Sequence, residues 1–124
     1  MSAPVTSKPR LPASMHVSST LIGRRTVLDL AGEVDLASTP LIADAIEDAL
    51  EAGALELWLD LSHVEFMDSA GVHLLVETHA RLRQLNRRLA IICPVAVVRR
   101  LLDLTGVTGL LPLYSDRAAA HRLA

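Results

Sequence analysis

Residues 57–72, LWLDLSHVEFMDSAGV, decide how this 124-residue chain folds. The leucines at 55, 57, 59 and 61 alternate with Glu56, Trp58 and Asp60, a period-two pattern that is typical of a β-strand with one strongly apolar face. From Val72 the period changes, because positions 72, 75, 76, 79 and 82 fall on one stripe of a helix. The stretch therefore predicts a central strand that leads through a short turn into a helix.

The change of period falls at Asp68-Ser69-Ala70-Gly71. Either Asp68 or Ser69 suits an N-cap, since a short side-chain oxygen can accept a hydrogen bond from an unpaired amide of the first turn. The Ser69 hydroxyl is then expected on the surface at the positive end of a helix dipole, where added negative charge is favoured. Two interpretations stay open on these residues alone: an ordinary helix cap and a site that accepts a phosphate.

The segments before this stretch predict a hairpin and a helix. Residues 15–21 and 26–31 have the pattern of two strands, joined by a turn at Gly23. Thr39 is predicted to cap a helix that has Pro40 at its first position and ends at Gly53.

The segments after it predict two more strands and two more helices. Residues 88–93 form a strand, and Pro94 opens a third helix with Val97 among its inward-facing residues. Residues 110–114 form a short edge strand, because Pro112 cannot donate to a ladder, and Asp116 with Ser115 caps a last helix that reaches about Leu123. The order predicts an α/β domain: a mixed, mostly parallel sheet with an N-terminal hairpin and about four α-helices.

Composition narrows the possible functions. Residues 1–14 are proline-rich without periodicity and are predicted to be a disordered tail, which leaves residues 15–124 as one domain. Cys93 is the single cysteine, which fits a reducing compartment. A net charge of −2 and only three aromatic residues argue against nucleic-acid binding. No apolar run is long enough for a membrane span, so we expect a cytoplasmic protein.

The residues around Ser69 do not predict an enzyme. A nucleophilic serine at a strand-to-helix elbow needs glycine two positions earlier, and that position is Met67. The five histidines include no pair four apart on a helix, which argues against a metal site. There is no glycine-rich loop to cradle phosphates, so no cofactor is expected and ATP would have to be brought by another protein.

Charge is distributed unevenly along the chain. Residues 26–80 hold twelve acidic side chains and neither lysine nor arginine. The Ser69 turn therefore lies in an acidic half of the sequence, which favours a partner with a basic surface.

Residues 66–72, together with Gly32-Glu33-Val34-Asp35-Leu36, resemble the STAS domain of bacterial anti-sigma factor antagonists. The resemblance extends over residues 15–123 and includes the segments 104–106 and 110–114. It implies that Ser69 is phosphorylated by a partner kinase that is itself the anti-sigma factor, and that a separate phosphatase reverses the modification. It also implies that the unmodified protein binds this kinase and releases a sigma factor.

On this interpretation the partner contacts the Ser69 turn and the loop at 32–36. The expected partner-binding residues are Asp35, Asp68, Ser69, Ala70, Gly71 and Val72, with none of them catalytic. Similar domains also serve as regulatory or scaffolding modules in sensory complexes, transporters and lipid-trafficking complexes, where the serine need not be modified. That alternative stays open at this point.

Overall fold

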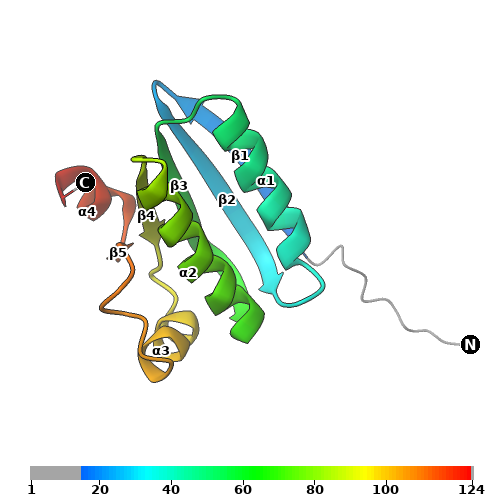
Figure 1. Cartoon of the computed structure of the whole chain (residues 1–124). Coiled ribbons are helices and arrows are strands. Elements are labelled where there is room, and N and C mark those ends of the chain that lie inside the picture. The colour runs from blue at the N-terminus through cyan, green and yellow to red at the C-terminus, as the bar shows by residue number, and fades with distance from the viewer. Residues whose placement is uncertain (1–14, 124) are drawn as a thin grey trace, which may run out of the picture.

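The computed structural model describes residues 15–123, which form one five-stranded sheet and four helices (Figure 1). The chain begins with β1 (His16–Ile22) and β2 (Arg25–Val34), continues through α1 (Thr39–Glu51) and β3 (Glu56–Met67), and enters α2 (Ser69–Gln84). It ends with β4 (Arg88–Ile92), α3 (Ala96–Leu104), β5 (Leu113–Tyr114) and α4 (Arg117–Leu123). The predicted tail, residues 1–14, lies outside the described residues.

The sheet has the strand order β1-β2-β3-β4-β5. β1 and β2 form an antiparallel hairpin, while β2–β3, β3–β4 and β4–β5 are parallel pairs. The prediction of a mixed, mostly parallel sheet with an N-terminal hairpin is therefore confirmed, and β3 is the central strand. Parallel order places the carboxyl ends of β2 and β3 at one edge of the sheet, where α1 and α2 begin.

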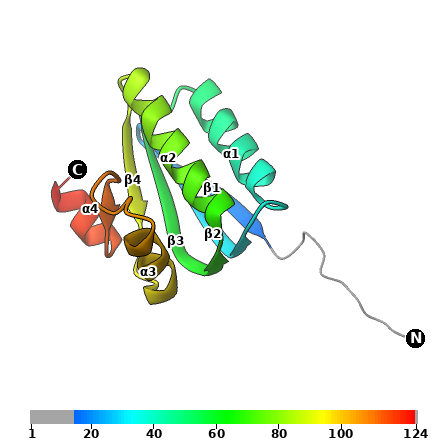
Figure 2. The same ribbon diagram turned by 60° about the horizontal axis from the view of Figure 1, so that its bottom comes forward.

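The main core lies between the sheet and the helices α1, α2 and α3. Figures 1 and 2 show α1 and α2 side by side over one face of the sheet. Leu57, Leu59 and Leu61 of β3 are fully buried in this core, with Ile42 of α1 and Leu75 of α2. The apolar face predicted from the leucines is thus the face that these helices cover.

The other face of β3 is also buried, which the alternation of apolar and polar residues did not predict. Trp58 and Asp60 are 1% and 5% exposed. Trp58 belongs to a second, smaller cluster with Val27 of β2 and Ala120 of α4. The C-terminal helix therefore covers part of the face that the sequence pattern assigned to solvent.

Several boundaries differ from the sequence predictions. β3 continues to Met67, with two irregularities in its register against β2, so the turn before α2 is shorter than its polar residues suggested. Ser38 rather than Thr39 is the N-cap of α1. Val97 is 57% exposed instead of facing inward, and β5 contains only Leu113 and Tyr114.

None of the helices within residues 15–123 combines the length and the apolar character that crossing a bilayer requires.

Candidate functional site

Ser69 is the first residue of α2, and its side chain is exposed to solvent. Asp68 is the N-cap: its carboxylate Oδ1 accepts hydrogen bonds from the Ala70 amide at 2.9 Å and from the Gly71 amide at 3.4 Å. Of the two N-cap candidates that the sequence offered, the structure selects Asp68. The Ser69 hydroxyl makes no hydrogen bond to any described residue, so it is available to a partner.

Gly71 lets the start of α2 lie close against the ends of two strands. A Cβ built on this residue would lie 2.5 Å from Cγ of Met67 and 2.8 Å from Cγ1 of Val34. Both distances are shorter than a carbon–carbon contact allows. Gly71 and Val72 are buried, so these two predicted partner-binding residues pack beneath the turn, while Ser69 lies above it.

The loop between β2 and α1 is held by hydrogen bonds of its own. Oδ1 of Asp35 accepts from the amides of Ala37 at 3.1 Å and Ser38 at 3.0 Å. The Ser38 hydroxyl accepts from the Asp35 amide and donates to the Glu33 carbonyl at 2.8 Å. These bonds fix the course of the loop and leave Asp35 half-buried.

A backbone hydrogen bond joins the two loops: the Asp68 amide donates to the Val34 carbonyl at 3.1 Å. The structure therefore brings the two predicted segments to one edge of the sheet. Among residues 15–123, neither Asp35 nor Asp68 forms a hydrogen bond with the Ser69 hydroxyl. In this structure both carboxylates accept hydrogen bonds from backbone amides instead.

Two large apolar side chains are exposed in the same two segments. Leu36, in the loop after β2, is 77% exposed, and Phe66, near the end of β3, is 48% exposed. Exposed apolar side chains next to a polar site are typical of a protein-binding surface. The sequence motif contained Phe66, but nothing in its periodicity showed that the ring faces solvent.

The acidic charge of residues 26–80 is partly neutralised by arginines that lie outside this stretch of the sequence. Arg117 of α4 pairs with Asp29 and Asp60. Arg81 of α2 pairs with Glu47 of α1. Nε of Arg25 lies 3.4 Å from Oε1 of Glu56. No such ion pair is made by Asp35 or Asp68 within the described part of the chain. The Asp35 and Asp68 carboxylates beside the Ser69 turn therefore keep their negative charge without an arginine from the described residues.

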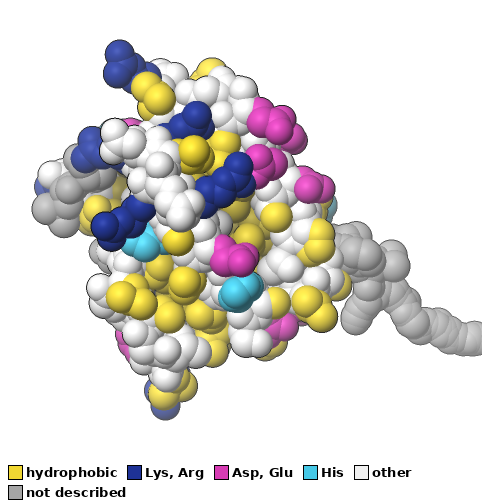
Figure 3. All heavy atoms as spheres, viewed as in Figure 1, with side chains coloured by type: hydrophobic (Ala, Val, Ile, Leu, Met, Phe, Trp, Pro, Cys, Tyr) yellow, Lys and Arg dark blue, Asp and Glu magenta, His cyan; other side chains and the backbone are white. Residues whose placement is uncertain are grey.

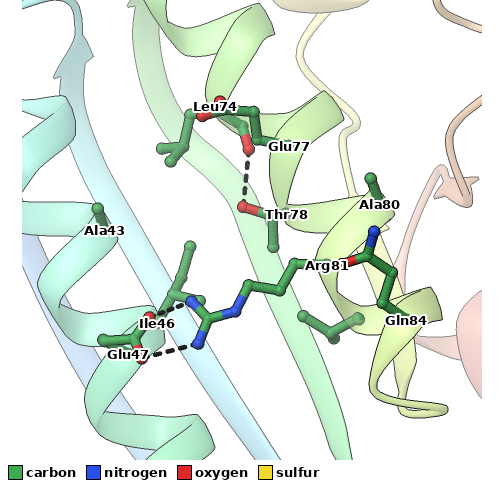
Figure 4. Close-up of a pocket in the computed structure, with 10 residues that line it drawn as sticks. Ala43, Ile46, Glu47, Leu74, Glu77, Thr78, Ala80, Arg81 and Gln84 are labelled. Carbon is green, nitrogen blue, oxygen red and sulfur yellow. Dashed lines mark hydrogen bonds and ion pairs between the residues drawn. The ribbon is translucent and has the colours of Figure 1, made fainter.

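A hollow of about 410 Å³ lies between α1 and α2 (Figure 4). The Arg81 guanidinium reaches across from α2 to both carboxylate oxygens of Glu47 in α1, and the Thr78 hydroxyl donates to the Leu74 carbonyl at 2.7 Å. The Arg81–Glu47 contact links the two helices, whereas the Thr78 bond lies within α2, and neither pairs a nucleophile with a base. Residues 15–123 also contain no cluster of three His, Cys, Asp or Glu side chains suited to a metal ion.

Comparison with known proteins agrees with this geometry. The family model of the STAS domain matches residues 16–120. The anti-sigma-F factor antagonist RsfB of Mycobacterium tuberculosis is 30% identical over 89 residues, which cover 72% of each chain.

Solved structures show the same fold. An anti-sigma factor antagonist from Mycobacterium paratuberculosis superimposes with a TM-score of 0.76 at 27% identity, over 91% of this chain and 97% of the other. The Bacillus cell fate determinant SpoIIAA in its phosphorylated form has a TM-score of 0.66 at 21% identity, over 88% and 100% of the two chains, which shows a shared fold.

The chain belongs to the STAS domain family, and the resemblance that the sequence indicated is confirmed. Within that family it belongs with the anti-sigma factor antagonists, which are regulatory binding proteins rather than enzymes. In this chain Ser69 lies on an exposed strand-to-helix turn.

Proposed function

We propose that the unmodified protein binds an anti-sigma factor kinase through the surface formed by the Ser69 turn and the loop at 32–36, and thereby releases a sigma factor. The observation that carries this proposal is the exposed Ser69 hydroxyl at the first position of α2, which has no hydrogen-bond partner among residues 15–123. Leu36 and Phe66 supply apolar area beside it, and the carboxylates of Asp35 and Asp68 supply charge for a basic partner surface.

In the proposed switch the kinase brings ATP and transfers its γ-phosphoryl group to Ser69. The serine oxygen bonds to the γ-phosphorus, the bond from that phosphorus to the bridging oxygen of ADP breaks, and a base of the kinase accepts the hydroxyl proton. The start of α2 suits the product, because the helix dipole favours negative charge at its N-terminus. A similar fold solved in a phosphorylated form supports the expectation that the domain accommodates the group.

Phosphorylation adds about −1.5 to −2 charges beside two carboxylates that make no ion pair with an arginine of the described part of the chain. The phosphate group and its hydration shell occupy the surface that the kinase contacts and compete with the contacts that Asp35 and Asp68 would make. A coupling free energy of about 1 to 3 kcal/mol weakens binding roughly 5- to 150-fold, which is enough to return the kinase to its sigma factor. A phosphatase then resets the protein, and we place this cycle in the cytoplasm.

The predicted partner-binding residues divide into two groups in this proposal. Asp35, Asp68, Ser69 and Ala70 are accessible and contact the kinase. Gly71 and Val72 are buried and hold the turn against the strand ends. Variants of the first group should alter affinity, and Asp68, which also caps α2, should alter stability as well. Variants of the second group should alter stability.

Two measurements test the proposal. The protein is incubated with the candidate anti-sigma kinase of its genome and ATP, and the phosphate is mapped by mass spectrometry, with Ser69 as the expected site. Calorimetric titration then compares Ser69→Ala, expected to bind like the unmodified protein, with Ser69→Glu, expected to bind at least five times more weakly. Ser115→Glu adds the same charge at another exposed serine and is the control.

Equal affinity of Ser69→Ala and Ser69→Glu, or phosphate found elsewhere, would exclude the switch. If the protein bound a sensory, transport or lipid-trafficking partner tightly, and Ser69→Ala and Ser69→Glu left that affinity unchanged, the result would favour the scaffolding alternative.

A further inference from the structure

Arginines surround the C-terminal end of α2, at the opposite end of this helix from Ser69. Arg83 lies in the last turn, Arg87 in the following loop, and Arg88 at the start of β4. With His79 and Tyr114 they line a hollow of about 260 Å³, which we call the basic hollow. Figure 3 shows dark blue side chains gathered over this end of α2, whereas acidic side chains follow α1. Ser69 and Arg83 are about 21 Å apart along the helix axis.

The positive charge of the basic hollow is not matched by acidic partners. Arg83 and Arg88 are exposed and make no ion pair within residues 15–123. Arg87 donates from Nη1 to the carbonyls of Leu50 at 3.0 Å and Ala54 at 3.1 Å. Those carbonyls are uncharged, so the guanidinium is held in place while its charge remains uncompensated.

Two sources of negative charge lie near the hollow and would oppose the binding of an anion: the Glu56 carboxylate and the C-terminal end of the α2 dipole. Other groups of the protein partly offset both of them. Glu56 also lines the hollow, but its carboxylate accepts from Nε1 of Trp58 at 2.9 Å and lies 3.4 Å from Nε of Arg25. The negative end of the α2 dipole is close by. The carbonyls of the last turn, however, accept hydrogen bonds from the amides of Leu85, Asn86 and Arg87.

A second observation comes from His79. Its Nδ1 atom is buried and has no hydrogen-bond partner among the described residues. Burial, with the nearby charge of Arg83, lowers the pKa of this imidazole, so the ring is neutral near pH 7. A buried nitrogen without a hydrogen-bond partner is uncommon in folded proteins. The ring lines the same hollow as the three arginines.

We propose that the basic hollow binds the phosphate group of a small phosphorylated molecule. Guanidinium groups present parallel N–H donors that match phosphate oxygens. The hollow is smaller than the usual range for drug-sized ligands, which suits a phosphate group with few other atoms. The aromatic side of Tyr114 and the ring of Pro112 provide an apolar wall for the rest of the molecule.

The test uses inorganic pyrophosphate as the probe and amide chemical shifts as the readout. At constant ionic strength set by sodium chloride, saturable shifts are expected for residues 79–89 and 112–114, and not for the Ser69 turn. The variant Arg83→Gln/Arg88→Gln should weaken binding at least tenfold. Arg100→Gln removes an exposed arginine of α3 that does not line the hollow, and it should leave binding unchanged.

Three results would overturn the proposal: shifts that sodium chloride alone reproduces, equal affinity of the double variant and the parent, or binding to phosphatidylglycerol vesicles without binding to pyrophosphate. Thermal unfolding verifies that the double variant is folded, and the single variant Arg88→Gln replaces it if it is not. The pyrophosphate result does not depend on the Ser69 switch, because the kinase titration compares variants of Ser69 and leaves Arg83 and Arg88 unchanged.

Discussion

Arg117 of α4 and Asp60 of β3, 57 residues apart in sequence, form an ion pair of 2.7 Å between Nε and Oδ2. Asp60 is 5% exposed, and its other oxygen accepts from the amide and hydroxyl of Ser62. Burial alone would raise the pKa of the Asp60 carboxyl, but the hydrogen bonds from Ser62 and Arg117 outweigh it and lower that pKa below 3.8. The pair attaches the C-terminal helix to the central strand.

This pair predicts a pH-dependent contribution to stability. Because the pKa of Asp60 is lower in the folded state, its contribution is complete above the unfolded value near 3.8 and is lost as the pH falls through the folded value. Asp60→Asn should cost about 1 to 3 kcal/mol at pH 7. Urea unfolding should show a constant difference between the variant and the parent at neutral pH, and that difference should shrink as the pH falls below about 4 and through the folded pKa of Asp60. Asp44→Asn, at an exposed carboxylate, is the control, and curves that stay parallel would contradict the assignment.

Gly71→Ala should destabilise the domain by about 1 to 3 kcal/mol, because the added methyl group overlaps Met67 and Val34. Gly109→Ala is the matched control: a Cβ there meets nothing within 4 Å, and the expected change is within about 0.5 kcal/mol. Chemical denaturation measures both. If the two substitutions had the same effect, the close approach at Gly71 would not be the cause.

Asp68→Ala should cost about 1 kcal/mol of stability, because it removes the carboxylate that accepts from the Ala70 and Gly71 amides. Asp68→Asn keeps an accepting oxygen and should recover most of that loss. Ser69→Ala, which removes an exposed hydroxyl without a partner, should change stability by less than about 0.5 kcal/mol. Thermal unfolding of the three variants tests whether Asp68 or Ser69 caps α2. A large loss of stability in Ser69→Ala would show that Ser69 is the cap and would contradict the assignment of Asp68.

Leu36→Ser and Phe66→Ser should each weaken kinase binding without lowering the unfolding temperature, because both side chains are exposed before the partner binds. Removing an apolar anchor from a protein interface costs more than 1 kcal/mol when that anchor is central. Leu85→Ser, at the far end of α2 and 44% exposed, is the control. Unchanged titrations for both variants would place the kinase on another surface.

Much of the site could be predicted from local sequence. The change from period two to period 3.6 placed the Ser69 turn, because such patterns depend on residues close together in the chain. The capping chemistry of Asp68 and the turn at Gly23 are local for the same reason. Predictions failed where contacts with a segment distant in sequence determine the structure. Trp58 and Asp60 are buried because α4 packs over them, and β3 extends to Met67 because it pairs with β2.

By itself the sequence determined the order of strands and helices, the position of a capped helix start, and the serine that this start presents, since neighbouring residues fix each of these. Only the tertiary structure decided that the loop at 32–36 lies beside that serine, joined through the Asp68 amide and the Val34 carbonyl. It alone also gathered Arg83, Arg87, Arg88 and His79 around one hollow. Such groupings depend on which strands pair in parallel and on how the helices pack against them, and neither follows from spacing along the chain.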